Sequence, residues 1–182
     1  MTREDIIKAG YELVAQEGFH KFTARNIAKL MGTSTAPIYA EFHSMDALKE
    51  TIFQRIENYL GEVIFNEVRT GDSIVDMGLN YIYFAMGENK LYKALYLEDY
   101  GGGERMHNFS YRMYTKRVSE DNKYQSLSKG QVDALHYGTW IIVTGLASLM
   151  SSHIIMPTEE QLISIIKDSY EALSKRDKSI FD

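Results

Sequence analysis

Residues 22–42 read FTARNIAKLMGTSTAPIYAEF, and this segment carries the strongest structural signal in the chain. Thr23 stands where a hydroxyl caps the first turn of a helix, and Ser34 stands in the same place before a second helix. Gly32 lies between them and suits a left-handed backbone that ends the first helix at little cost. Pro37 falls in the first turn of the second helix, where its missing N–H is tolerated. The pattern predicts two short helices joined by a glycine turn, the layout of a helix-turn-helix.

The second predicted helix has a face that suits DNA. Small residues let a helix sit deep in a major groove, and hydroxyls can meet phosphates or base edges. The first N–H groups of such a helix can also hold a phosphate. Many helical proteins contain similar corners without binding DNA, so a purely structural corner is the alternative. The residues on this face are Thr35, Ala36, Tyr39 and Ala40.

The same segment resembles the DNA-binding region of the TetR family of bacterial transcriptional repressors. Members carry Thr-x-x-x-Ile-Ala, a glycine turn, a Ser, then x-Tyr-x-x-Phe and an acidic residue shortly before a Leu. The resemblance implies an all-α fold with an N-terminal three-helix helix-turn-helix DNA-binding domain, residues 1–46. A C-terminal helical domain for effector binding and dimerisation, residues 47–182, would follow. The matching residues are Thr23, Ile27, Ala28, Gly32, Ser34, Tyr39, Phe42, Asp46 and Leu48.

The resemblance also implies which side chains face DNA. Two positions depart from the family pattern: Met45 stands where a lysine is common, and Glu41 stands where a basic residue is frequent. Both departures remove positive charge, so we expect modest affinity and a shallow salt dependence. Packing roles fall to Ile27, Ala28, Ile38 and Phe42. The predicted DNA-binding residues are Arg25, Thr33, Ser34, Thr35, Ala36, Tyr39, His43 and Lys49.

Composition sets limits on the whole chain of 182 residues, which has a net charge of -5 and no cysteine. The absence of cysteine excludes a disulfide framework and a cysteine-based zinc site or nucleophile. The N-terminus lacks the pattern of a signal peptide, and the most apolar segment, residues 140–150, is too short to span a bilayer. We therefore expect a cytoplasmic location and no membrane partner. The acidic charge argues mildly against nucleic acid, because phosphate affinity comes largely from Lys and Arg.

Beyond the corner, the sequence reads as helical, because it has two prolines and no sustained strand alternation. Ser44 is expected to cap a long helix whose apolar stripe ends at Val63. Further helices are expected near 73–86, 90–97 and 105–118. Capping boxes at Ser128-x-x-Gln131 and Thr158-x-x-Gln161 predict two final helices, to about residues 152 and 174.

Aromatic and methionine side chains gather in the predicted helices of the second half. Ordinary core packing explains such residues, but tyrosine hydroxyls need partners, which favours a pocket for a small apolar or aromatic effector. Glu98 and Asp99 could add preference for a cation, or form a solvated loop edge. The predicted ligand-binding residues are Tyr81, Phe84, Tyr92, Tyr96, Met106, Phe109, Met113, His136 and Trp140.

The last two helices are predicted to form a homodimer interface. Small residues on one helix allow close approach, the other has a broad apolar stripe, and a symmetric DNA reader needs two copies. The alternative is that both stripes pack inside one subunit. The predicted interface residues are Gly138, Gly145, Ser148, Ser152, Leu162, Ile165, Ile166 and Tyr170.

No spacing of histidines or carboxylates indicates a metal or a nucleophile, so we expect no cofactor, no metal and no enzymatic activity. The prediction is a ligand-responsive transcriptional regulator, a repressor released from a palindromic DNA operator by a small molecule. The alternative function is a helical small-molecule-binding protein whose N-terminal corner is structural.

Overall fold

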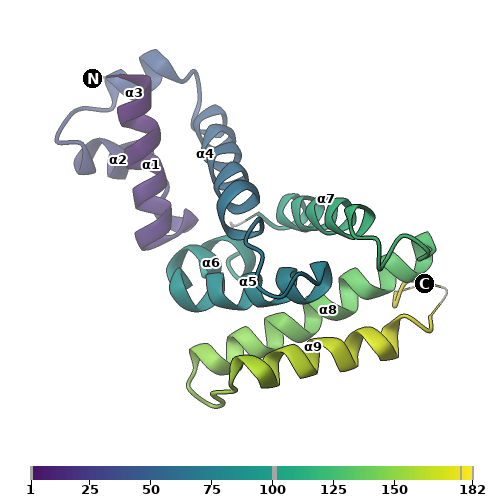
Figure 1. Ribbon diagram of the computed structural model, residues 1–182. Coiled ribbons are helices and arrows are strands. Elements are labelled where there is room, and N and C mark those ends of the chain that lie inside the picture. The colour runs from purple at the N-terminus through teal and green to yellow at the C-terminus, as the bar shows by residue number, and fades with distance from the viewer. Residues whose placement is uncertain (1, 100–101, 177, 182) are drawn as a thin grey trace. The chain divides into compact units, whose positions relative to one another are not determined.

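The computed structural model describes residues 2–99, 102–176 and 178–181, and every regular element in these ranges is helical (Figure 1). The predicted all-α fold is confirmed. None of the described helices is long and apolar enough to cross a membrane. The elements are α1 (Arg3–Glu17), the 3-10 turn η1 (Phe19–Lys21), α2 (Ala24–Leu30), α3 (Ala36–Glu41), α4 (Met45–Tyr59), the π-helical turn η2 (Leu60–Ile64), α5 (Ser73–Gly87), α6 (Asn89–Tyr96), α7 (Glu104–Glu120), α8 (Lys129–Ser151) and α9 (Glu159–Leu173).

Side-chain caps start four of these helices where the sequence predicted them. The Thr23 and Ser44 hydroxyls each accept a hydrogen bond from the backbone N–H three residues on, at 3.2 and 3.1 Å. Ser128 and Thr158 both close a capping box with the glutamine three residues later. Each cap satisfies N–H groups that the helix itself leaves without a partner, so the start is set locally.

Two predicted details were wrong. Ser34 does not cap the second short helix: α3 begins at Ala36, its cap position is Thr35, and no side chain bonds to its first turn. The stripe of the long helix does not reach Val63, which is 57% exposed. The π-helical turn after Tyr59 explains this, because an i→i+5 turn rotates the following residues off the stripe's face.

The chain forms two compact units, of which the first contains α1 to α4, α6 and the start of α7. In this unit α1 packs against α2, α4 and α6, although α6 is distant in sequence. Its core is largely aliphatic, with buried rings such as Phe42 and Tyr92. The most deeply buried side chains are Ile6, Val14, Ile27, Leu48, Ile52 and Ile56.

The second unit contains η2 from Gly61, α5, most of α7, α8 and α9. Helices α8 and α9 run side by side and antiparallel, and α5 packs against both (Figure 1). Glycines permit the close approach: a Cβ on Gly78 would lie 2.8 Å from Cδ1 of Ile166, and one on Gly138 would lie 2.2 Å from Cδ1 of Leu173. Both contacts are within one chain, so this packing needs no second copy.

Candidate nucleic-acid interface and ligand cavity

The helix-turn-helix corner is built on a buried apolar side. Ile27 of α2, Ile38 of α3 and Phe42 after α3 are each at most 2% exposed. Gly32 turns the chain between the helices with a φ of 66°, a left-handed value that side chains disfavour. Helix α2 packs on α1, and α3 buries Ile38 on one side while it presents its other side to solvent.

That outer side carries polar groups without partners inside the chain. Tyr39 is 50% exposed. Within the described residues, no side-chain hydrogen bond or ion pair involves Arg25, Ser34, Thr35, Tyr39 or His43. Ala36 and Ala40 are also exposed, and Thr33 is half-buried. The corner thus brings most of the predicted DNA-binding residues onto or beside one solvated surface.

Two cationic side chains near the corner, Lys49 and Arg3, contact aromatic rings of the first unit. The Nζ atom of Lys49 lies 5.0 Å from the centre of the Phe19 ring and 5.7 Å from that of Phe53. Lys49 therefore covers aromatic rings of its own unit, which the sequence did not indicate. Arg3 makes a similar contact, because its Cζ lies 4.4 Å from the centre of the Phe42 ring, next to the end of α3. No local signal could have found Arg3, since it is far from Phe42 in sequence.

Arg105, at the start of α7, forms ion pairs with two glutamates of α4. Its Nε donates to Oε1 of Glu57 at 2.6 Å, and it also donates to Glu50. The hydrogen bond from Arg105 lowers the pKa of Glu50. The guanidinium also lies 5.0 Å from the centre of the Phe53 ring. One residue of α7 thus fixes two carboxylates spaced along α4.

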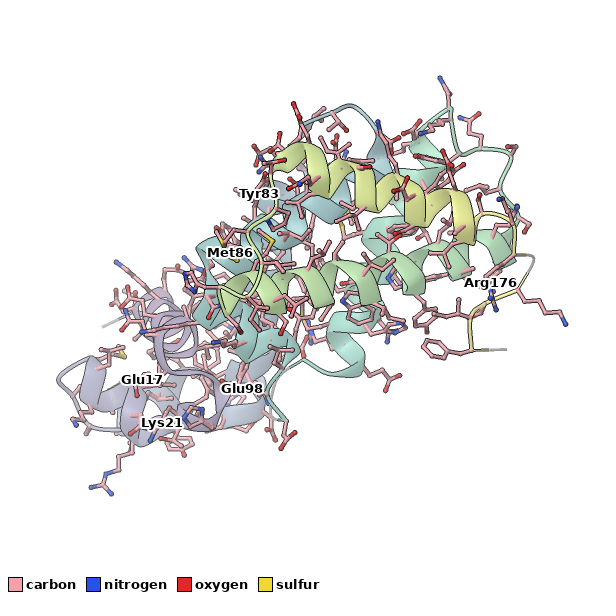
Figure 2. All side chains as sticks on the ribbon, turned by 90° about the horizontal axis from the view of Figure 1, so that it is seen from below. Glu17, Lys21, Tyr83, Met86, Glu98 and Arg176 are labelled. Atoms are coloured by element: carbon pink, nitrogen blue, oxygen red, sulfur yellow. The ribbon has the colours of Figure 1, made fainter. Side chains whose placement is uncertain are left out.

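Glu98 makes a second long-range contact in this unit (Figure 2). Its Oε2 accepts a hydrogen bond from the Phe19 backbone N–H at 3.2 Å and lies 3.7 Å from Nδ1 of His20. A Cβ on Gly18 would lie 2.4 Å from Oε1 of Glu98, so the carboxylate fits because that residue is glycine. Glu98 therefore binds the turn after α1, and the idea that it prefers a cationic ligand finds no support here.

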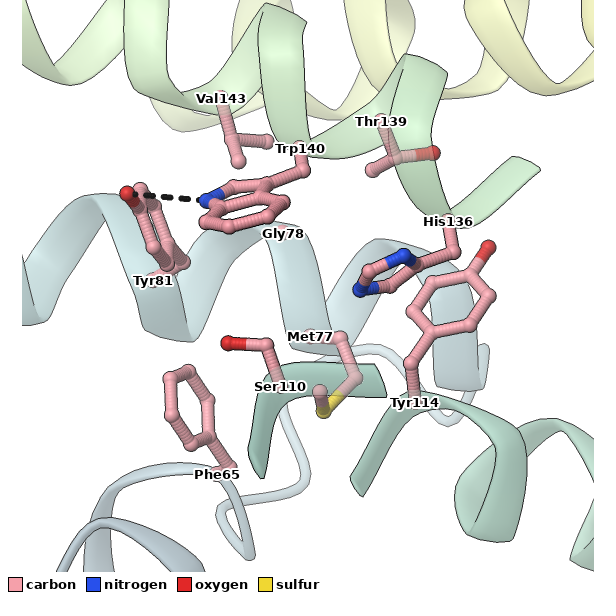
Figure 3. A pocket seen from close by; sticks show the side chains of 10 residues that line it. All are labelled: Phe65, Met77, Gly78, Tyr81, Ser110, Tyr114, His136, Thr139, Trp140 and Val143. Carbon is pink, nitrogen blue, oxygen red and sulfur yellow. Dashed lines mark hydrogen bonds between the residues drawn. The ribbon is translucent and has the colours of Figure 1, made fainter. Parts of the chain in front are cut away.

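A small cavity of ≈ 40 Å³ lies in the second unit, between α5, α7 and α8 (Figure 3). Its walls are largely apolar and aromatic, and no charged side chain lines it within the described residues. The lining residues are Phe65, Met77, Gly78, Tyr81, Ser110, Tyr114, His136, Thr139, Trp140 and Val143.

Tyr81, His136 and Trp140 were predicted to bind ligand, and they line this cavity. The other predicted residues do not. Phe84 and Phe109 are buried in the core of the second unit, and Met113 lies near Gly61. Tyr92, Tyr96 and Met106 belong to the first unit. The aromatic content of the second half correctly indicated the region of the cavity. The other lining residues are mostly small or aliphatic, and such residues occur throughout a helical core, so the sequence did not single them out.

The polar groups of the cavity fall into two sets. On one side, Nε1 of Trp140 donates to the Tyr81 hydroxyl at 3.3 Å, and that hydroxyl lies 3.0 Å from Oγ1 of Thr144. On the other side, the hydroxyls of Tyr114 and Thr139 are both buried beside His136 (Figure 3). Neither makes a well-aligned hydrogen bond within the described residues, but the Thr139 hydroxyl interacts with that of Tyr114 and by itself lowers its pKa. Burial raises the pKa of Tyr114, so its hydroxyl stays protonated at neutral pH.

His136 lies among aromatic rings. The ring centres of Tyr111 and Tyr114 are each 5.2 Å from its own, and that of Trp140 is 5.7 Å away. The Tyr111 hydroxyl donates to Oδ1 of Asp133 at 2.6 Å, which, with burial, raises the pKa of Tyr111 to about 12. This tyrosine is therefore neutral and held in place as one wall of the His136 surroundings.

Several predicted interface residues are covered within the chain. Leu162 and Ile166 are at most 1% exposed. Gly138 meets Leu173 as described above, and the Tyr170 ring lies 5.2 Å from that of Tyr124. The intrachain alternative therefore accounts for these positions, because one face of each helix is used to pack α8 on α9 and α5.

The other predicted interface residues are on the surface. Gly145, Ser148 and Ser152 are exposed along α8, and Ile165 of α9 is 37% exposed. Ile141 and Leu149 extend the same face of α8, at 56% and 40% exposure. The sequence has no Asp, Glu, Lys or Arg between residues 133 and 159. This uncharged surface, from Ile141 to Ser152, is called the α8 face below.

Comparison with known proteins shows a family match at the N-terminus and a shared fold over the rest of the chain. Residues 6–52 match the model of the family described as bacterial regulatory proteins, tetR family. No curated protein matches the chain. A putative transcriptional regulator TetR family protein from Vibrio parahaemolyticus has a similar structure, with a TM-score of 0.65, 16% identity, and coverage of 93% of this chain and 97% of the other.

Two further solved structures are similar over nearly the whole chain. The fatty acid degradation regulator FadR from Bacillus halodurans has a TM-score of 0.59 and 14% identity, covering 94% of this chain and 93% of the other. A TetR-like transcriptional regulator from Rhodococcus sp. RHA1 has a TM-score of 0.56 and 13% identity, covering 95% and 96%.

Residues 6–52 are similar to the N-terminal region of tetR-family regulators, as the motif in residues 22–48 predicted. The chain as a whole has the fold of the solved TetR-family structures.

Proposed function

We propose that this protein is a ligand-responsive repressor that binds a palindromic DNA operator as a homodimer in the cytoplasm, without catalytic activity. Residues 1–46 read the DNA, and residues 47–182 bind the effector and the second copy. The observation that carries the proposal is the outer side of α3, where exposed polar side chains have no partner within the described chain. Such groups are available for phosphates and base edges.

On DNA, α3 enters the major groove with Thr35, Ala36 and Tyr39 toward the bases. Ser34, Thr33 and His43 lie beside it, and Arg25 supplies positive charge for phosphates. Lys49 is left out, because it already covers Phe19 and Phe53. Few cations meet the DNA, so log affinity should fall only gently with log salt.

The second copy packs on the α8 face. Exposed Ile141, Gly145, Leu149 and Ile165 offer apolar contact without charged groups to desolvate. An uncharged core with apolar residues is what distinguishes homodimer interfaces from ordinary surface. Two recognition helices then lie about 34–36 Å apart, one turn of DNA.

Helix α7 supplies a route from effector to DNA. It carries Ser110 and Tyr114 of the cavity and, five and nine residues before them, Arg105, which holds Glu50 and Glu57 of α4. An effector that binds one position of α7 better than another therefore biases α4 and the corner that precedes it in the chain. Arg105→Gln removes both charge pairs and should reduce the effector's influence on DNA binding.

A gel-shift titration on the DNA upstream of the protein's own reading frame tests the proposal. We expect a sequence-selective shift that survives competitor DNA and weakens as salt is raised. The absence of any selective shift, even at low salt, would show that the protein is not an operator-binding repressor.

A second candidate function is a small-molecule-binding protein whose corner is structural. The net charge of -5 and the exposed Glu41 on α3 favour it. Substituting Thr35 and Tyr39 separates the two functions. If the wild type binds DNA and the folded variant does not, the regulator function is supported. If neither the wild type nor the variant binds DNA, the small-molecule-binding function is supported.

A further inference from the structure

The contact from Glu98 to the turn after α1 joins the end of α6 to the start of the helix-turn-helix. We infer that Glu98 is a positioning residue for DNA binding. It holds the turn, residues 18–22, in the place from which α2 and α3 read the operator, and it acts without touching DNA. This inference rests on the proposed operator binding and names a residue that controls it.

Glu98 is anchored through its backbone and through its side chain. Its backbone N–H donates to the Lys93 carbonyl at 3.1 Å, in the last turn of α6. Its carboxylate accepts from the Phe19 N–H at 3.2 Å. Phe19 is 5% exposed, so that N–H depends on a partner inside the chain. The end of α6 and the turn after α1 are therefore held together by this one side chain.

Hydrogen bonds within the turn pass its position on to α2. The Phe22 N–H donates to the Phe19 carbonyl at 3.0 Å. The Asn26 side chain donates to the Lys21 carbonyl at 2.8 Å. Asn26 lies in the first turn of α2, next to Arg25. A shift of Phe19 therefore moves the start of α2 and the predicted DNA contact that it carries.

Gly18 shapes the turn to accept the carboxylate. Its φ is 85°, a value that favours glycine, and a Cβ there would lie 2.4 Å from Oε1 of Glu98. Figure 2 shows Glu98 close to the segment from Glu17 to Lys21. A larger residue at position 18 would displace the carboxylate from the Phe19 N–H, so the contact can be broken from either side.

A positioning role and a purely electrostatic role of Glu98 predict opposite results. Removing a negative charge near DNA should tighten binding, because phosphates repel carboxylates. Losing the contact should weaken binding, because fewer molecules then hold the turn in the reading position. Glu98→Gln removes the charge but keeps an oxygen that accepts a hydrogen bond, whereas Glu98→Ala removes both.

Gel-shift titration of the full chain, with folding checked by circular dichroism, tests the inference. We expect Glu98→Ala to weaken operator binding on the order of tenfold, the effect of about one hydrogen bond, and Glu98→Gln to stay within about twofold of the wild type. Glu17→Ala removes an exposed carboxylate beside the turn and is the charge-matched control, which should not weaken binding. Unchanged or tighter binding by folded Glu98→Ala, or equal weakening by Glu98→Gln, would overturn the inference.

Glycine variants break the contact from the turn. Gly18→Ala should weaken operator binding as much as Glu98→Ala, and the double variant should be little weaker than either, because the same contact is lost. Gly71→Ala is the matched control: Gly71 has a φ of 83° and no atom within 4 Å of an added Cβ, so it carries the backbone strain alone. Two effects that add fully in the double variant would show that the residues act separately and would contradict the inference.

Hydrogen exchange of the Phe19 amide reads the contact without DNA. It should be faster in Glu98→Ala than in Glu98→Gln or the wild type, and equal protection in all three would mean that Glu98 does not hold the turn. The result is separable from that of the proposed function. If the wild type and Glu98→Ala bind the operator equally well, the repressor proposal stands and the positioning role is wrong. If the wild type binds no DNA selectively, both are wrong.

Discussion

The α3 surface and the cavity wall both carry hydroxyls, but in opposite environments. Thr35 and Tyr39 are open to water, which can satisfy their hydroxyls. Thr139 and Tyr114 are almost fully buried and interact with each other without a well-aligned hydrogen bond, and a buried hydroxyl left unsatisfied costs about 1–3 kcal/mol. The contrast indicates that the polar groups on α3 cost little stability, whereas those beside the cavity cost more.

The largest expected effect is on the DNA-reading surface. Tyr39→Ala should weaken operator binding about tenfold to a hundredfold, because one base-edge contact is worth about 1–3 kcal/mol. The free energy of unfolding should change little, since the Tyr39 side chain is half exposed. Gel shift and urea unfolding measure the two quantities. Glu41→Gln is the control, and it should tighten binding by removing a negative charge. Equal affinity of Tyr39→Ala and wild type would remove α3 from the interface.

A pair of glycine variants on α8 tests how the second unit packs. Gly138→Ala should destabilise the protein by about 1–3 kcal/mol, because its Cβ would lie 2.2 Å from Leu173. Gly145→Ala meets no atom within 4 Å and should stabilise the helix by up to about 1 kcal/mol. Urea unfolding measures both. If Gly145→Ala also weakens dimerisation in sedimentation, the α8 face is the interface; an unchanged dimer would place the interface elsewhere.

The same substitution should have opposite signs in the two regions. Thr139→Val replaces a buried hydroxyl that makes no well-aligned hydrogen bond, although it lies beside the Tyr114 hydroxyl, and should raise the free energy of unfolding by about 1 kcal/mol. Thr23→Val removes the cap of α2 and should lower the free energy of unfolding by about 1 kcal/mol. Thermal and urea unfolding of the two variants provide the comparison. Destabilisation by both would mean that Thr139 has a partner in solution.

The smallest effect concerns pH. Burial opposes the charge of Asp72, but hydrogen bonds from Lys123, Tyr124 and the backbone of α5 together lower its pKa. A lowered folded-state pKa stabilises the fold above the unfolded value of about 3.9, and this stabilisation is lost as pH falls through the folded value. Asp72→Asn keeps the cap and removes the charge. It should be less stable than wild type near neutral pH and equal to it in strong acid.

Urea midpoints across the acid range check this expectation. A difference between Asp72→Asn and wild type that persists unchanged in strong acid would show that the charge of Asp72 is not its source. Because the partner Lys123 is half exposed, solvent screening keeps the effect small.

Local sequence accounts for the helices and for the corner. Caps at Thr23, Ser44, Ser128 and Thr158 and the turn at Gly32 lie within three or four residues of the groups that they serve. Interactions of that range can be recognised from residue type and spacing. The exception, Ser34, had the right type but lies one residue too early to cap α3.

Contacts between distant segments could not be anticipated in this way. Arg3 over Phe42, Lys49 over Phe19, Glu98 at the turn after α1 and Arg105 on α4 all join residues far apart in sequence. Residue types indicated where charges and rings occur, but not which pairs meet, because pairing depends on how the helices pack.

For this chain, the helical class and the helix-turn-helix corner follow from residue order, since caps, turns and a 3.6-residue periodicity are local properties. The cavity, the two buried hydroxyls beside it and the division of α8 between a packed face and an exposed one exist only after the helices pack. They arise from side chains of α5, α7 and α8 that converge from separate parts of the chain, and no local pattern records that convergence.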